Sequence, residues 1–173
     1  MKTWYSCKIK YAKENDEGLL KQVTDAFLVD AISYTEAETR IYAIAEEILS
    51  REFVVTQITK TNISEIIKME EADDWYKSKI TYVANDDESG KEIKVTIYYL
   101  VCAEHVKQAF EYIEEFMSSM LVPYQVPSIT RTNIVEVFPF SEDDNAIANQ
   151  QKDDQAKEEI ENYIAQDDDE SED

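Results

Sequence analysis

Aromatic and cationic side chains alternate along two short stretches of the chain, WYSCKIKY (4–11) and WYKSKITY (75–82). Alternate residues of a strand lie on one face, so each stretch would bring a tryptophan and two lysines to the same side. Such a face suits single-stranded nucleic acid, because bases stack on rings and phosphates pair with cations. A further cation recurs in the motifs ITKTNI and ITRTNI. The predicted nucleic-acid-binding residues are Trp4, Lys8, Lys10, Lys60, Trp75, Lys77, Lys79 and Arg131.

No comparable pattern supports catalysis. A nucleophile or an acid–base pair must lie within hydrogen-bond reach of its partner, yet the chain has a single histidine, His105, at an expected helix start. We interpret His105 as a helix cap or a surface side chain. Cys7 and Cys102 lack metal-ligand spacing, and we interpret both as small buried hydrophobic residues. The sequence therefore predicts no enzyme, no cofactor and no metal site.

The two stretches belong to a longer internal repeat. Four blocks match in the same order, at 4–11 and 75–82, 23–31 and 95–103, 35–49 and 107–121, and 58–66 and 129–137. Chance can produce one such match but hardly four in register, so the sequence indicates two copies of one unit, at 1–70 and 72–140.

Each copy is expected to contain strand, turn, strand, helix and strand. The turns end at Gly18 and Gly90, which can adopt the positive φ of a hairpin. The third strand of the first copy is expected to run over 53–67, and Pro127 predicts an edge or a bulge in its counterpart. The predicted fold class is α+β, an internal tandem duplication of a ββαβ unit that forms a pseudo-twofold domain, followed by a disordered acidic tail.

The expected helices carry one apolar face each, which would pack on a sheet. Ser33 or Thr35 can cap the first helix. The apolar faces comprise Ala37, Ile41, Ile44, Ala45 and Ile48 in the first copy, and Ala109, Ile113, Phe116, Met117 and Met120 in the second.

The negative charge is concentrated in the tail, residues 141–173. This segment carries 14 acidic residues and two lysines, a net charge of −12 out of −21 for the whole chain. A short helix is expected at about 144–165, and the block of like charge after it predicts disorder. Such an arm can recruit a protein partner and compete with nucleic acid for the binding face. The residues predicted for that role are Asp167, Asp168, Asp169, Glu170, Glu172 and Asp173.

The composition also indicates the cellular compartment. The chain has only two cysteines, and its start, MKTWYSCKIK, has no apolar leader segment. It has no run of about 18 apolar residues that could span a membrane. We therefore expect a cytoplasmic protein.

Three segments carry a resemblance to a known family. WYSCKIKY (4–11), VTDAFLVDAISYTEAE (23–38) and VFPF (137–140) resemble an uncharacterised family of Bacteroidetes bacteria and their phages. The resemblance covers about residues 1–140, and the tail lies outside it. The family carries only a domain-of-unknown-function label. It implies an intracellular bacterial or phage setting, implies no activity, and transfers no functional residues.

Three functions stay open at this point. The first is a non-enzymatic accessory protein that binds single-stranded DNA and uses its acidic arm as described. The second is an acidic interaction protein, a DNA mimic or an inhibitor of a host enzyme, since the net charge suits competition for a cationic site. The third is a structural or assembly module, with a homo-oligomer as one form. Residues 1–140 are themselves acidic, which opposes phosphate contact, and the tryptophans could instead bury the seam between the copies.

Overall fold

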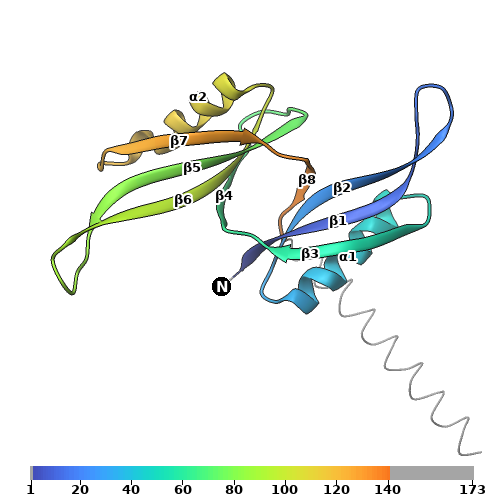
Figure 1. The fold of residues 1–173 in the computed structure, drawn as a ribbon, viewed down its shortest axis with the longest axis horizontal. Helices are drawn as coiled ribbons and strands as arrows, with labels where there is room; N and C mark the ends of the chain where they lie inside the picture. The colour runs from blue at the N-terminus through green and yellow to red at the C-terminus, as the bar shows by residue number, and fades with distance from the viewer. Residues whose placement is uncertain (1, 141–173) are drawn as a thin grey trace, which may run out of the picture. The chain divides into compact units, whose positions relative to one another are not determined.

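The computed structural model describes residues 2–140. Its architecture is mixed α+β, with two four-stranded sheets and two α-helices (Figure 1). The predicted tail helix, the predicted tail disorder and the six predicted tail residues lie outside the described residues. The elements are β1 Thr3–Glu14, β2 Leu20–Ala31, α1 Tyr34–Ile48, β3 Phe53–Lys60, β4 Ile63–Ile67, β5 Asp74–Asn85, β6 Glu92–Ala103, α2 Val106–Phe116, the 3₁₀-helix η1 Met117–Ser119, β7 Tyr124–Arg131 and β8 Ile134–Phe138.

Each sheet takes three strands from one half of the chain and one strand from the other half. The strand orders are β3-β1-β2-β8 and β4-β6-β5-β7. The hairpins β1–β2 and β5–β6 are antiparallel, and β3 and β7 pair antiparallel with β1 and β5. In contrast, β8 pairs parallel with β2, and β4 pairs parallel with β6. The last strand of each half therefore completes the sheet of the other half, as Figure 1 shows.

This exchange corrects the predicted ββαβ unit. The run 53–67 is two strands, because β3 ends at Lys60 and β4 begins at Ile63 in the other sheet. Each half thus contributes ββαββ, with the final short strand exchanged. Residues up to Phe138 form one compact unit, which follows from two sheets that each need a strand from both halves.

A threonine anchors the chain at each crossing. The backbone N–H and the hydroxyl of Thr61 both donate to the carbonyl oxygen of Trp4, each at 2.8 Å. Thr132 makes the same two bonds to the carbonyl oxygen of Trp75, also at 2.8 Å. Each threonine directly follows the last residue of an edge strand, β3 or β7. The residues after it form a strand of the other sheet, β4 or β8. The repeated TNI motif therefore marks the crossing and not the middle of a strand.

The turn and edge predictions are confirmed. Gly18 and Gly90 have φ angles of 77° and 65°, in the region that favours glycine. Pro127 lies in β7, which is an edge strand, and the pairing with β5 shifts register there. A proline is tolerated at this place because its missing N–H interrupts no continuous ladder.

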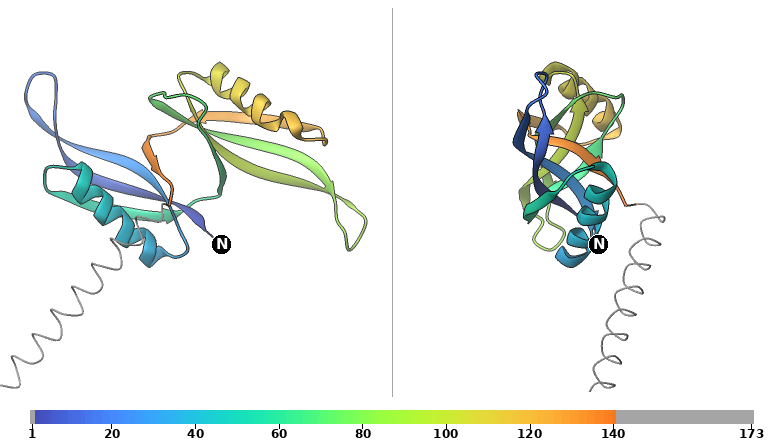
Figure 2. Two further views of the ribbon diagram at one scale, coloured as in Figure 1. Left: turned by 180° about the vertical axis from the view of Figure 1, so that it is seen from behind. Right: turned by 90° about the vertical axis from the view of Figure 1, so that its right-hand side faces the viewer.

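Each helix covers one face of one sheet (Figure 2). The first core combines Tyr5, Cys7, Ile9, Phe27, Val29 and Ala31 of β1 and β2 with Ala37, Ile41 and Ala45 of α1. The second core combines Tyr76, Ile80, Tyr99, Val101 and Ala103 with Ile67, Ala109, Ile113 and Met117. The predicted apolar faces are therefore correct in outline. One member is corrected, because Ile48 is 45% exposed. Phe116 is 41% exposed but still packs on the sheet, since its ring meets that of Tyr99 edge-on with the centroids 5.4 Å apart.

The helix starts are capped as predicted. The Ser33 hydroxyl accepts from the backbone N–H of Glu36 at 3.2 Å. His105 holds the equivalent place at α2, where its Nδ1 accepts from the backbone N–H of Gln108 at 3.1 Å. The interpretation of His105 as a cap is thus confirmed. No helix within residues 2–140 has the length and apolar character needed to cross a membrane.

Candidate nucleic-acid interface

The two tryptophans lie where the halves of the chain meet. A buried cluster, which we call the seam cluster, consists of Leu28, Ile63, Trp75, Leu100, Cys102 and Val137, with Trp4 partly buried against it. Trp75 is 2% exposed, so its ring is not open to a base in this fold, and its interpretation as a stacking residue is corrected. The exchanged strands are the cause, because β4 and β8 bring Ile63 and Val137 into the cluster.

Lys60 and Arg131 lie on a different face from the other predicted cations. Directly opposed residues of an antiparallel pair point to the same face of a sheet. Lys60 stands opposite Tyr5 and Arg131 opposite Tyr76, and both tyrosines belong to the cores beneath the helices. Arg131 is also paired, with its Nη2 at 2.6 Å from Oδ1 of Asp74. These two cations therefore do not join the predicted patch.

The sequence contained a signal for this placement. Lys60 follows Ile58 by two residues, and Arg131 follows Ile129 by two, so each cation shares a face with its isoleucine. Both isoleucines pack against the cores.

The remaining lysines do share the faces that carry no helix. Lys8 and Lys10 lie on the helix-free face of the first sheet, and Lys77 and Lys79 lie on that of the second. Cross-strand neighbours define what we call the β1 lysine face, with the rows Thr59–Ser6–Leu28, Gln57–Lys8–Ala26 and Val54–Lys10–Thr24. The β5 lysine face has the rows Thr130–Lys77–Leu100, Ser128–Lys79–Tyr98 and Gln125–Thr81–Thr96. None of these side chains is acidic.

The β5 lysine face also carries an aromatic ring. Tyr98 stands opposite Lys79, and the Lys77 ammonium lies 4.8 Å from the centroid of the Tyr98 ring. The same ammonium donates to the Asn62 amide oxygen at 2.6 Å. Tyr98 was not among the predicted binding residues, although its spacing from Leu100 places both on one strand face. This face thus combines two cations with a half-buried ring.

Exposed carboxylates are numerous on the helices. The exposed acidic residues of the two helices are Glu38, Glu46 and Glu47 in α1, and Glu111, Glu114 and Glu115 in α2. Each helix lies on the face of its sheet opposite the lysine face. The exposed helix glutamates and the four lysines Lys8, Lys10, Lys77 and Lys79 therefore lie on opposite faces of the sheets, in a chain whose overall charge is −21.

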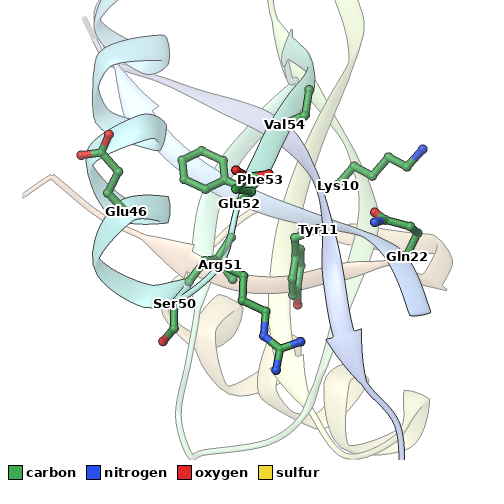
Figure 3. A pocket seen from close by; sticks show the side chains of 10 residues that line it. Lys10, Tyr11, Gln22, Glu46, Ser50, Arg51, Glu52, Phe53 and Val54 are labelled. Carbon is green, nitrogen blue, oxygen red and sulfur yellow. The ribbon is translucent and has the colours of Figure 1, made fainter. Parts of the chain in front are cut away.

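A pocket of about 950 Å³ opens beside the start of β3 (Figure 3). Its lining includes Lys10 and Arg51, but also Glu46 and Glu52. Arg51 Nη2 lies 3.5 Å from a carboxylate oxygen of Glu14. Acids thus balance the cations of this pocket, so it has no clear preference for an anion.

Tyr11 lines the same pocket and is hydrogen-bonded to the neighbouring strand β2. Its hydroxyl donates to Oδ2 of Asp25 at 2.6 Å. Burial, and after it the hydrogen bond and charge of Asp25, raise the pKa of Tyr11 to about 12. The phenol therefore stays protonated at neutral pH, with its hydroxyl committed to the neighbouring strand.

Both cysteines are buried and free, as expected for small hydrophobic residues. Cys7 and Cys102 are 0% exposed. Burial raises the pKa of Cys7 to about 12 and also raises the pKa of Cys102. A thiol held protonated in this way is a poor nucleophile and a poor metal ligand. Residues 2–140 contain no group of three or more His, Cys, Asp or Glu placed to hold a metal ion.

Comparison with known proteins gives a family and nothing more specific. The model of a domain of unknown function, DUF4494, matches residues 3–140, so the chain belongs to that family. No curated protein and no solved structure matches the chain.

Proposed function

We propose that this member of the family is a non-enzymatic accessory protein that binds single-stranded nucleic acid, DNA in the first instance, on its two lysine faces. The observation that carries the proposal is that the rows around Lys8, Lys10, Lys77 and Lys79 contain no acidic side chain and lie on the faces opposite the helix glutamates. Phosphate contacts dominate the affinity of proteins for nucleic acid, and they require cations away from competing carboxylates. The rows of Lys8 and Lys10, and of Lys77 and Lys79, meet that requirement in an otherwise acidic chain.

The chemistry around these lysines supports the same reading. Alternate residues of a strand lie about 7 Å apart, so each lysine pair can contact more than one phosphate. Serine, threonine and glutamine side chains, which donate hydrogen bonds to phosphate and sugar oxygens, occupy most neighbouring positions of the rows. Tyr98 offers a ring for stacking on the second face.

The proposal also covers the origin of the two halves, the role of the acidic tail and the cellular compartment. We propose that the two halves arose by duplication of one ββαββ unit, which the equivalent strand orders support. We also propose that the acidic residues 167–173 recruit protein partners and compete with nucleic acid for the lysine faces. A cytoplasmic setting in Bacteroidetes or their phages completes the proposal, and two free buried cysteines suit a reducing compartment.

Fluorescence anisotropy with a labelled thymidine oligonucleotide of about twenty nucleotides tests the proposal. The full chain should bind at low salt, and a chain ending at Phe140 should bind more tightly. Lys79→Gln should weaken binding and reduce the slope of log K against log salt concentration by about 0.7.

Lys60→Gln is the matched control, because it removes the same charge from the opposite face of a sheet. It should leave affinity and slope nearly unchanged. Equal effects of the two substitutions, or the absence of salt-dependent binding, would refute the proposed interface.

The alternative of an acidic interaction protein has one observation in its favour. The exposed glutamates of α1 and α2 form acidic helix surfaces, which could imitate a nucleic-acid backbone toward a basic protein. Failure of the oligonucleotide to bind, together with capture of a cationic nucleic-acid-binding enzyme, would favour this second function.

A further inference from the structure

The β5 lysine face brings one aromatic ring and two cations together. Lys79 stands directly opposite Tyr98 on the neighbouring strand, so both side chains leave the same face of the sheet. The Lys77 ammonium lies over the Tyr98 ring, 4.8 Å from its centroid. All three side chains are half-buried, which leaves part of each open to solvent. The ring and both lysines are therefore neighbours on the helix-free side of the second sheet.

Lys77 is held by neutral groups. Its ammonium donates to the Asn62 amide oxygen at 2.6 Å and lies against the Tyr98 ring. It forms no ion pair within residues 2–140, whereas Arg131 of the same half is bound to Asp74. A cation–π contact at a partly exposed site is weak, and an ammonium binds an anionic oxygen more strongly than a neutral amide. A phosphate can therefore draw Lys77 away from both of its partners.

Departure of the ammonium would uncover the Tyr98 ring and the Asn62 amide. The row next to Tyr98 on the side away from the seam cluster has Thr81 opposite Thr96. These short side chains leave room above the sheet for a base to lie against the ring. The Asn62 amide is exposed and offers both a donor and an acceptor to the edge of a base. One movement of Lys77 would thus prepare a place for a base beside a bound phosphate.

The first half lacks this combination. Ser6 stands where the second half has Lys77, and Ala26 stands opposite Lys8 where the second half has Tyr98 opposite Lys79. None of the three rows of the β1 lysine face contains an aromatic ring. The two halves share the backbone frame, but only the second half has a ring beside its cations.

We propose that Lys77, Tyr98 and Asn62 form a subsite for one nucleotide of a single strand, in which Lys77 and Tyr98 exchange partners on binding. The phosphate takes the Lys77 ammonium, and the base stacks on the Tyr98 ring that this ammonium covers in the free protein. The Asn62 amide hydrogen-bonds the edge of the base. Tyrosine rings beside cations commonly hold the bases of single strands. This inference rests on the proposed function and adds to it one position for a base, in the second half alone.

The test compares two labelled oligomers of equal length, a thymidine oligonucleotide and a phosphodiester that lacks all its bases. The full chain should bind the thymidine oligomer about tenfold more tightly, which is the effect of one stacked base. Tyr98→Leu should abolish that preference and leave the salt slope unchanged, because it removes the ring and keeps both cations. Lys77→Gln should keep the preference and lower the salt slope for both oligomers by about 0.7.

Tyr34→Leu is the matched control for the ring, because Tyr34 is 53% exposed at the start of α1, away from either lysine face. It should keep both the preference and the slope. Lys60→Gln remains the control for the charge. Circular dichroism establishes that each variant is folded, and Tyr98→Met replaces Tyr98→Leu if the latter is not.

The outcomes separate this inference from the proposed function. Equal binding of the two oligomers by the unaltered chain overturns the subsite, while salt-dependent binding of both still upholds the lysine faces. A preference for bases that survives the loss of the Tyr98 ring also overturns the subsite. Binding of neither oligomer overturns both proposals.

Discussion

Trp4 and Trp75 are the second residues of the corresponding strands β1 and β5, yet Trp75 is 2% exposed and Trp4 is only partly buried. Both are held at their carbonyl oxygens by a threonine of the crossing segment, Thr61 or Thr132. The backbone surroundings are therefore alike, and the difference lies in the side chains that cover each ring. A repeated residue does not guarantee a repeated environment, because its cover comes from the other half of the chain.

Two pockets at corresponding places also differ in chemistry, the one beside the start of β3 and a second one beside the start of β7. The second has a volume of about 470 Å³ and is lined by Thr81, Tyr82, Val83, Lys94, Pro123, Tyr124 and Gln125. Their backbones correspond in register, but Gln22 is replaced by Lys94 and Asp25 by Ile97. One pocket is consequently balanced in charge, with Tyr11 held by a carboxylate, and the other is cationic. Similar backbones thus carry two different binding chemistries, and substitutions at paired positions can measure how far the halves differ.

Substitutions in the seam cluster are expected to have the largest effect on the free energy of unfolding. Trp75→Ala should lower the free energy of unfolding by about 3–5 kcal/mol, because it leaves a large cavity between strands of both halves. Trp4→Ala should cost less, about 1–3 kcal/mol, because part of that ring is already in water. Urea unfolding followed by far-ultraviolet circular dichroism measures both. Equal costs would show that the two rings contribute alike to the seam cluster.

Substitutions of the helix caps, which differ between the halves, are expected to have a smaller effect on the free energy of unfolding. Ser33→Ala and His105→Ala should each lower the free energy of unfolding by about 1 kcal/mol, because each leaves a backbone N–H of the first helical turn without its acceptor. His105→Ser should retain most of the stability, since it installs the cap of the first half. Thermal unfolding of the three variants checks this. A stable His105→Ala variant would mean that the imidazole bond contributes little.

The last expected effect on stability is confined to alkaline pH. The folded chain holds the pKa of Tyr11 at about 12, above its usual 10.0, so the unfolded chain loses this proton first. Stability from this shift is fully present below about pH 10 and is lost as pH rises toward 12. Tyr11→Phe should flatten that alkaline decline in stability and remove a late step from the absorbance titration of phenolate. Tyr82→Phe, with Ile97 in the place of Asp25, is the control and should leave the late step in place.

Much of the fold could be predicted because its signals are local. The alternation of Tyr5, Cys7 and Ile9 identified the buried face of β1, and a strand of period two imposes that choice. The candidate interface was predicted less completely. Lys8, Lys10, Lys77 and Lys79 do lie on helix-free faces, while Trp75 is buried and Lys60 and Arg131 point to the helix side. The burial of Trp75 depends on pairing between distant strands, whereas Ile58 and Ile129, two residues before Lys60 and Arg131, already indicated the face of those cations.

The sequence by itself determined the hairpin strands β1, β2, β5 and β6, the two positive-φ glycines, the helix caps and the concentration of acid in the tail, since each depends on neighbouring residues. Only the tertiary structure decided where the strands β4 and β8 pair and which rings the seam cluster buries. The physical reason is that a short apolar strand can complete any sheet that offers an open edge. The choice between edges is made by the anchoring threonines and by burial against the opposite half, neither of which is visible in residue type alone.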